Sequence, residues 1–219
     1  MPDLVQLAIN QGVPQETIVY ILMYPIILTI IAAARQVVGI KAFGIYTPSI
    51  IAVALLATTL KYGIAIFIVI LAVALGMRFV LKSFKLLYMS RTAIMLSVVA
   101  VAVLAFLAIG GSLQRTGLAS VSIFPLLIMI TIVEKFVIVQ MENGYKTALM
   151  LAFETIFLAA ICYFFVKWEA FQSLILDFPG IVVLIVILNI ALGKWTGLRL
   201  SEYYRFRDVI SNVELPRKK

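Results

Sequence analysis

Seven apolar runs separated by polar or basic links make up most of this chain. Four long runs and two shorter ones contain no charged residue, and a fifth long run contains one. A helix that crosses the hydrocarbon core of a bilayer needs ~20 mainly apolar residues. We therefore predict an all-α membrane protein with seven transmembrane helices, at 17–34, 47–60, 62–77, 92–114, 119–133, 147–166 and 178–193.

The basic residues fall mainly on one side of this arrangement. With seven crossings, 15 of the 18 Lys and Arg residues share one side, and only Lys61, Arg115 and Lys167 lie on the other. Cytoplasmic loops carry an excess of Lys and Arg. The predicted parts are therefore a short extracytoplasmic N-terminal segment, a seven-helix membrane domain and a basic cytoplasmic tail, at 1–16, 17–198 and 199–219.

A five-crossing topology is the alternative, with the two short runs as re-entrant segments. It places the basic cluster 78–91 outside, and the split becomes 13 inside and five outside. Seven crossings fit the charge rule better.

The composition excludes several functional classes. With 64% hydrophobic and 13% charged residues, the chain cannot cover a soluble domain with polar surface. Its net charge of +8 suits loops that face anionic lipid, so we predict no nucleic-acid partner. The chain has no His and only one Cys, which argues against a metal site. We find no nucleotide-binding loop or nucleophile–base pair, and we expect no enzyme activity and no cofactor.

The order of runs suggests two three-helix units followed by one extra helix. Each unit has a Gly-containing link, an aromatic residue and a proline before its short run, at Tyr46 and Pro48 and at Phe124 and Pro125. Units with an odd number of crossings would form a 3+3 inverted repeat, as in many transporters. Alternatively, the prolines simply begin helices in the first turn, where a missing N–H costs nothing.

Four polar residues are candidates for an intramembrane site. Glu154 lies eight residues into an apolar run, where a carboxylate costs about 2.5–3.5 kcal/mol, so it should face the protein interior. Two roles are open for it, a functional acid and a neutral hydrogen-bonding strut. Asn189 is its predicted partner by depth. Glu134, on a helix that could continue to residue 141, and Arg35 are predicted to form a partly buried, structural ion pair near the inner boundary.

Two segments carry a family resemblance. The run 34–48, ARQVVGIKAFGIYTP, resembles the signature after the first helix of a bacterial seven-transmembrane-helix domain usually fused to an inactive transglutaminase-like domain. Residues 193–207 resemble that family's ending, and Glu134, Glu142 and Gly144 fall where it has an acidic stretch. The resemblance covers residues 13–210. We expect a transglutaminase-like partner either to be a separate polypeptide or to have been lost.

Both segments lie on the predicted inner side and are rich in Gly and basic residues, so we interpret them as a docking surface for a soluble partner. Anchoring of the tail arginines to lipid phosphates is the alternative. The candidate docking residues are Lys41, Gly44, Pro48, Gly197, Arg199, Glu202, Arg205 and Arg207.

A more distant resemblance is to the small membrane subunit, the C subunit, of poly-γ-glutamate biosynthesis. Its Gly-rich, Pro-containing links match 39–48 and 115–125. This resemblance implies an amino-acid ligase partner of the ATP-grasp or Mur-ligase type and a role in peptide or polyglutamate-like envelope chemistry at the bacterial plasma membrane. A stand-alone secondary transporter or channel, and a scaffold that tethers soluble partners, are the alternatives.

The charge count gives a direct test of topology. A reporter fused after Lys219 should be active only in the cytoplasm, and one fused before Asp3 only outside. Cytoplasmic activity at both ends would require an even number of crossings and would contradict the seven-helix prediction.

Overall fold

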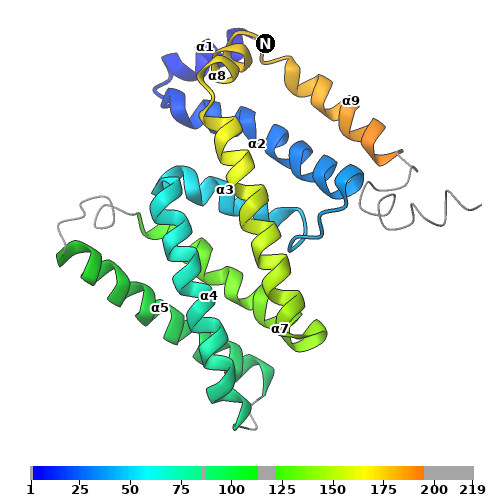
Figure 1. The fold of residues 1–219 in the computed structure, drawn as a ribbon. Helices are drawn as coiled ribbons and strands as arrows, with labels where there is room; N and C mark the ends of the chain where they lie inside the picture. The colour runs from blue at the N-terminus through cyan, green and yellow to red at the C-terminus, as the bar shows by residue number, and fades with distance from the viewer. Residues whose placement is uncertain (1, 85–86, 113–121, 195–219) are drawn as a thin grey trace, which may run out of the picture. The chain divides into compact units, whose positions relative to one another are not determined.

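The computed structural model describes residues 2–84, 87–112 and 122–194, and its elements in these ranges are helices (Figure 1). In chain order they are α1 (Pro2–Asn10), α2 (Gln15–Ala33), the π-helical turn η1 (Ala34–Val38), α3 (Tyr46–Thr58), α4 (Leu60–Lys82), α5 (Tyr88–Ser112), α7 (Ile123–Lys167), α8 (Glu169–Asp177) and α9 (Ile181–Gly193). The predicted all-α class is confirmed.

Four helices in the described part are long and apolar enough to cross a membrane: Gln15–Val38, Leu60–Leu81, Tyr88–Gly111 and Ile123–Lys167. The pair α8 and α9 gives a fifth when counted as one span bent by 105°. The chain is thus a multi-pass membrane protein. The crossing number of seven and the orientation of the termini stay predictions.

Helix α7 consists of two consecutive helices. Its 45 residues are about twice the ~20 that one crossing needs. Gly144 interrupts the helical backbone with φ 83° and ψ 167°, in a region that glycine adopts readily. The chain turns back there, and the two parts of α7 lead away from the break in different directions in Figure 1. The first part continues to Asn143, so the predicted end at residue 133 is too early.

Helix α3 is short and central. Its 13 residues span about 20 Å, less than the ~30 Å of a hydrocarbon core. Ile51, Ala52 and Leu55 are fully buried, and α3 packs chiefly against α7 and also contacts α4. Its hydrophobic residues therefore form the core of a unit made of residues 42–169, which we call the α3–α7 unit.

A stripe of mainly small side chains faces the interior on the second part of α7. Small residues let membrane helices approach closely, so dispersion contacts between helices can replace the hydrophobic effect that lipid does not supply. The buried members of this stripe are Ala148, Ala152, Thr155, Leu158, Ala159, Cys162 and Val166.

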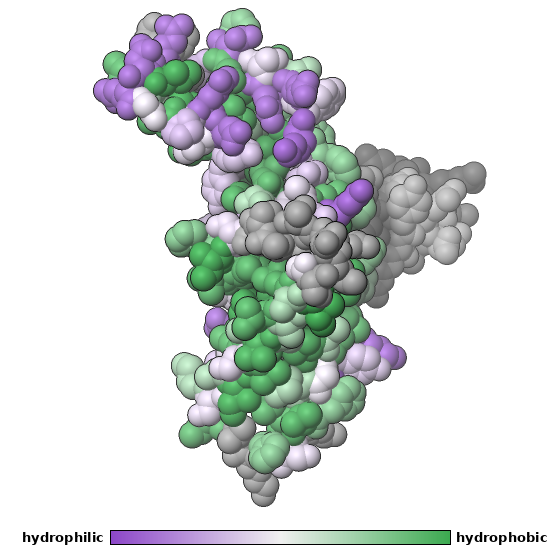
Figure 2. Space-filling view, turned by 90° about the vertical axis from the view of Figure 1, so that its left-hand side faces the viewer, coloured by the Kyte–Doolittle hydropathy of each residue, from purple (hydrophilic) through white to green (hydrophobic). Residues whose placement is uncertain are grey.

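The outer surface of the α3–α7 unit is apolar. Ile68, Leu104, Phe153 and Phe164 are each more than half exposed. The lower part of Figure 2, where this unit lies, is largely hydrophobic on the visible face. Such a surface suits contact with lipid chains.

A second unit comprises residues 1–41 and 170–219, of which the structure describes the part up to residue 194. Its helices α2 and α9 pack against each other. The short helices α1 and α8 lie in links that the apolar pattern left unassigned.

Pro48 and Pro125 each occupy the third position of a helix, after the N-caps Ile45 and Ser122. This agrees with the interpretation that the prolines begin helices, because the first four N–H groups have no partner within a helix. Helix α3 is also much shorter than the first part of α7. The inverted repeat remains a prediction.

The corner between α3 and α4 is tight and strained. Thr59 joins the helices with φ 64° and ψ 151°, which is unusual for a β-branched residue. A Cβ atom at Gly63 would lie 2.7 Å from the Thr58 Oγ1 and would overlap the Leu55 side chain. Glycine at position 63 therefore allows α4 to begin beside the end of α3.

We predict that Gly63→Ala lowers the free energy of unfolding by about 1–3 kcal/mol through overpacking. Gly76→Ala in the same helix is the matched control, because a Cβ atom at Gly76 meets nothing within 4 Å. It should be neutral or stabilise by up to about 1 kcal/mol through higher helix propensity. Thermal unfolding in detergent measures both, and equal effects would contradict the close-approach argument.

Candidate functional site

The most structured feature of the family-like segment is its turn at 42–45, directly before α3. Ala42 has φ 28° and Gly44 has φ 78°, so the turn uses backbone conformations that ordinary side chains rarely adopt. The Gly44 N–H donates to the Ala42 carbonyl over 2.8 Å. The turn therefore satisfies part of its backbone internally and needs acceptors from elsewhere for the rest.

Two neighbouring side chains of α7 provide these acceptors. The Ala42 N–H donates to Glu154 Oε2 at 3.0 Å, and the Phe43 N–H donates to Thr155 Oγ1 at 3.0 Å. The Thr155 hydroxyl donates in turn to the Leu151 carbonyl at 2.6 Å. We call Glu154 and Thr155 the α7 clamp, because they hold the turn through two consecutive amides.

Aromatic packing seals the α7 clamp. The Phe43 ring meets the Phe136 ring edge to face, with centroids 6.5 Å apart and an interplanar angle of 82°. Phe136 and Thr155 are fully buried, and Ala42 and Phe43 are buried as well. Water therefore has little access to the Phe43 amide, whereas the hydrogen bond between the Ala42 amide and Glu154 is partly buried.

The α7 clamp lies well inside the helical bundle. Glu154 is ten residues from Gly144, which at ~1.5 Å per residue places it about 15 Å along the helix from the reversal of α7. Non-helical backbone is tolerated at membrane depth only where protein groups satisfy it. Glu154, whose carboxylate is unfavourable in the hydrocarbon core, is thus also the hydrogen-bond acceptor that the turn requires.

This geometry favours the strut among the two roles predicted for Glu154. Its carboxylate is half-buried and accepts a hydrogen bond from the backbone, which is a structural role. Thr155 was not among the predicted site residues. The sequence signal for such a pair is the turn itself. A Gly-containing, non-helical segment between apolar helices needs hydrogen-bond acceptors for its backbone amides.

Asn189 takes part in a different polar contact. Its Nδ2 donates to Thr29 Oγ1 at 2.7 Å and to the Ile185 carbonyl at 3.1 Å. Thr29 Oγ1 donates to the Pro25 carbonyl at 2.8 Å. Asn189 thus joins α9 to α2 near the proline of α2. The pairing of Asn189 with Glu154 stays a prediction, since the two residues belong to different units.

The remaining intramembrane candidates are Arg35 and Glu134. Arg35 is half-buried in η1, and Glu134 is exposed on the first part of α7. They also belong to different units, so their ion pair stays a prediction.

The predicted docking residues divide into described and undescribed ones. Lys41 is exposed, Gly44 is half-buried in the turn, and Pro48 is buried in the first turn of α3. Pro48 therefore positions the surface instead of forming it. Gly197, Arg199, Glu202, Arg205 and Arg207 lie outside the described residues.

We predict that Thr155→Val and Glu154→Leu each lower the free energy of unfolding by about 1–3 kcal/mol, because each leaves a buried N–H without an acceptor. Glu154→Gln keeps a carbonyl acceptor and loses the charge, so it should cost less than half as much as Glu154→Leu. Thermal unfolding in detergent gives all three values. If Glu154→Gln is as damaging as Glu154→Leu, the charge and not the hydrogen bond matters.

Comparison with known proteins agrees with this architecture. No curated protein and no solved structure matches the chain. One family model matches residues 3–210, and its description is seven transmembrane helices usually fused to an inactive transglutaminase. That match covers nearly the whole chain, including the turn at 42–45 and both parts of the α7 clamp. The chain therefore belongs to this family of seven-transmembrane-helix domains usually fused to an inactive transglutaminase.

Proposed function

We propose that this chain is a non-catalytic membrane module that presents a rigid surface, formed around residues 41–46, to an extramembrane partner. The observation that carries the proposal is the α7 clamp, which fixes two consecutive amides of the turn at 3.0 Å each. A surface held in one conformation loses little entropy when a partner binds.

The side chains at this surface suit recognition. Lys41 is exposed, Ile45 is 38% exposed and Tyr46 is 73% exposed. Between them, the α7 clamp accepts hydrogen bonds from the backbone amides of residues 42 and 43. Exposed aromatic side chains such as Tyr46 are common in binding hot spots, and Lys41 adds a positive charge five residues earlier in the chain. The tail segment 193–207 would add basic residues on the same predicted side.

The family description supports a transglutaminase-like domain as one partner, in the same polypeptide or in another. The resemblance to the C subunit of poly-γ-glutamate biosynthesis supports an ATP-grasp amino-acid ligase as a second. The proposed setting is the bacterial plasma membrane, where the module would serve synthesis or export of an amide-linked peptide or polymer.

The test is affinity purification of the full chain from its native membrane, compared with the double variant Lys41→Gln, Tyr46→Ala. We expect a transglutaminase-like protein or an ATP-grasp ligase with the wild type, and at least a fivefold loss of it with the variant. Lys61→Gln, which removes an exposed lysine at the start of α4, is the control and should keep the partner. Undiminished recovery with the double variant would contradict the proposed surface.

One observation favours a secondary transporter as the second candidate. The helical chain is interrupted between η1 and the short helix α3 by the turn at 42–45, and Glu154 accepts a hydrogen bond from this turn. Transporters often build their sites from such interrupted helices.

Proton-driven uptake into liposomes would separate this candidate from the module. Transport by the wild type and its loss in a fully folded Glu154→Gln protein would support a proton-carrying acid. Absence of transport by the wild type, together with a co-purified partner, would support the module.

A further inference from the structure

Two depressions follow one another along α4 and the second part of α7 in the α3–α7 unit, and we call them together the groove. The first is a depression of about 430 Å³, lined only by apolar side chains. Aromatic residues on its rim are open to the surroundings, with Phe153 70% and Phe157 50% exposed. The lining residues are Ile64, Phe67, Ile68, Leu71, Leu149, Phe153, Ile156, Phe157 and Ala160.

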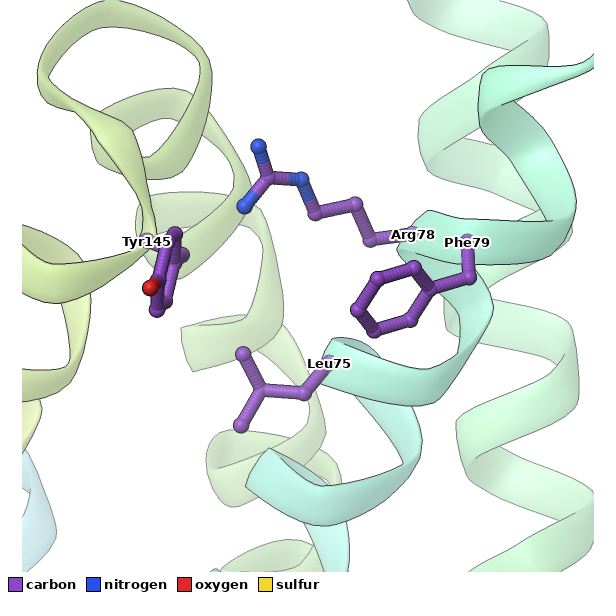
Figure 3. A pocket seen from close by; sticks show the side chains of 4 residues that line it. All are labelled: Leu75, Arg78, Phe79 and Tyr145. Atoms are coloured by element: carbon purple, nitrogen blue, oxygen red, sulfur yellow. The ribbon is translucent and has the colours of Figure 1, made fainter.

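The groove acquires a positive charge at one end. The next turns of α4, together with Tyr145 just after the reversal of α7, line a second depression of about 280 Å³. Figure 3 shows the Arg78 side chain reaching from α4 toward Tyr145, with Leu75 and Phe79 on the same helix. The Arg78 guanidinium carbon lies 5.5 Å from the centre of the Tyr145 ring.

Arg78 is the charged residue of this end. Within the part of the chain that the structure describes, its interaction is with the Tyr145 ring, and no carboxylate neutralises it. A guanidinium on an aromatic face keeps N–H groups free to form paired hydrogen bonds with a phosphate. The charge is therefore available to an anion.

The dimensions match one lipid molecule. From Ile64 to Arg78 the groove extends along α4 for about 20 Å, slightly more than the ~15 Å that one leaflet contributes to the hydrocarbon core. The Arg78 end is the cytoplasmic end by the charge count, where anionic headgroups concentrate. An apolar groove about as long as one leaflet is thick, with a cation at the level of the lipid headgroups, fits a phospholipid better than a peptide or a free ion.

We propose that this groove binds one anionic phospholipid, with an acyl chain along the apolar section and the phosphate on Arg78. The net negative headgroup is selected because none of the described residues lining the site supplies a counter-charge to Arg78. Basic pockets between membrane helices on the cytoplasmic side commonly hold such headgroups. The site does not depend on the partner surface proposed above.

The test is native mass spectrometry of the full chain released from nanodiscs of equal phosphatidylglycerol and phosphatidylcholine. We expect one retained lipid, mostly phosphatidylglycerol. Arg78→Gln should lower the preference for phosphatidylglycerol about fivefold, the effect expected for one basic residue near the surface. Arg78→Lys should keep part of it. Arg91→Gln, another basic residue of the predicted inner side, should leave it unchanged.

A second variant tests the apolar section. Ala160→Phe should fill the groove and reduce retained lipid of both kinds, whereas Ala108→Phe, at an exposed position on α5, should not. Glycerophosphate, which has the headgroup without chains, should not compete at millimolar concentration.

Several results would overturn the proposal. An equal loss of preference in Arg91→Gln would indicate general attraction to the basic face. Unchanged lipid retention in both Arg78→Gln and Ala160→Phe would mean that protein covers the groove, from another part of this chain or from a second copy. Full competition by glycerophosphate would indicate a phosphate site that does not hold a lipid.

Discussion

The structure depends most on the need to satisfy backbone polar groups away from water. Inside a bilayer an unpaired N–H or C=O costs several kcal/mol, so non-helical chain is tolerated only where side chains or neighbouring backbone supply partners. The turn at 42–45 meets this condition through Glu154 and Thr155, which accept from two consecutive amides. These acceptors stabilise the turn directly before α3, and α3 packs chiefly against α7.

This constraint explains which residues could be predicted from sequence. Long apolar runs are explicit in the composition of α2, α4, α5 and α7, so the helices and the all-α class follow from hydropathy. Glu154 stood out because a charge in such a run is rare. Its partner did not, because a backbone amide carries no residue-type signature and Ala42 is ordinary in the sequence. The π-helical turn η1 likewise leaves no mark in the apolar pattern.

Errors at helix ends share a single physical cause. The fifth apolar run was predicted to end at residue 133, but Glu134 and Lys135 lie on an exposed face and the helix continues to Asn143. The actual break is at Gly144, where φ is positive. Helix ends in this chain are set by backbone conformation and by tertiary acceptors, and charge marks them only indirectly. Pairing of Asn189 with Thr29 also depends on which helices pack, which one sequence does not reveal.

The same reversal at Gly144 connects the interior of the α3–α7 unit with its surface. By folding α7 back on itself, it places the small-residue stripe of the second part against the core and leaves the opposite face of that part beside α4. Small side chains on the inner face allow close packing, while Phe153 and Phe157 on the outer face form an open rim. One helix therefore holds the turn at 42–45 on one side and lines the groove that ends at Arg78 on the other. A substitution that tilts the second part of α7 would alter both surfaces together, because both include residues of this helix.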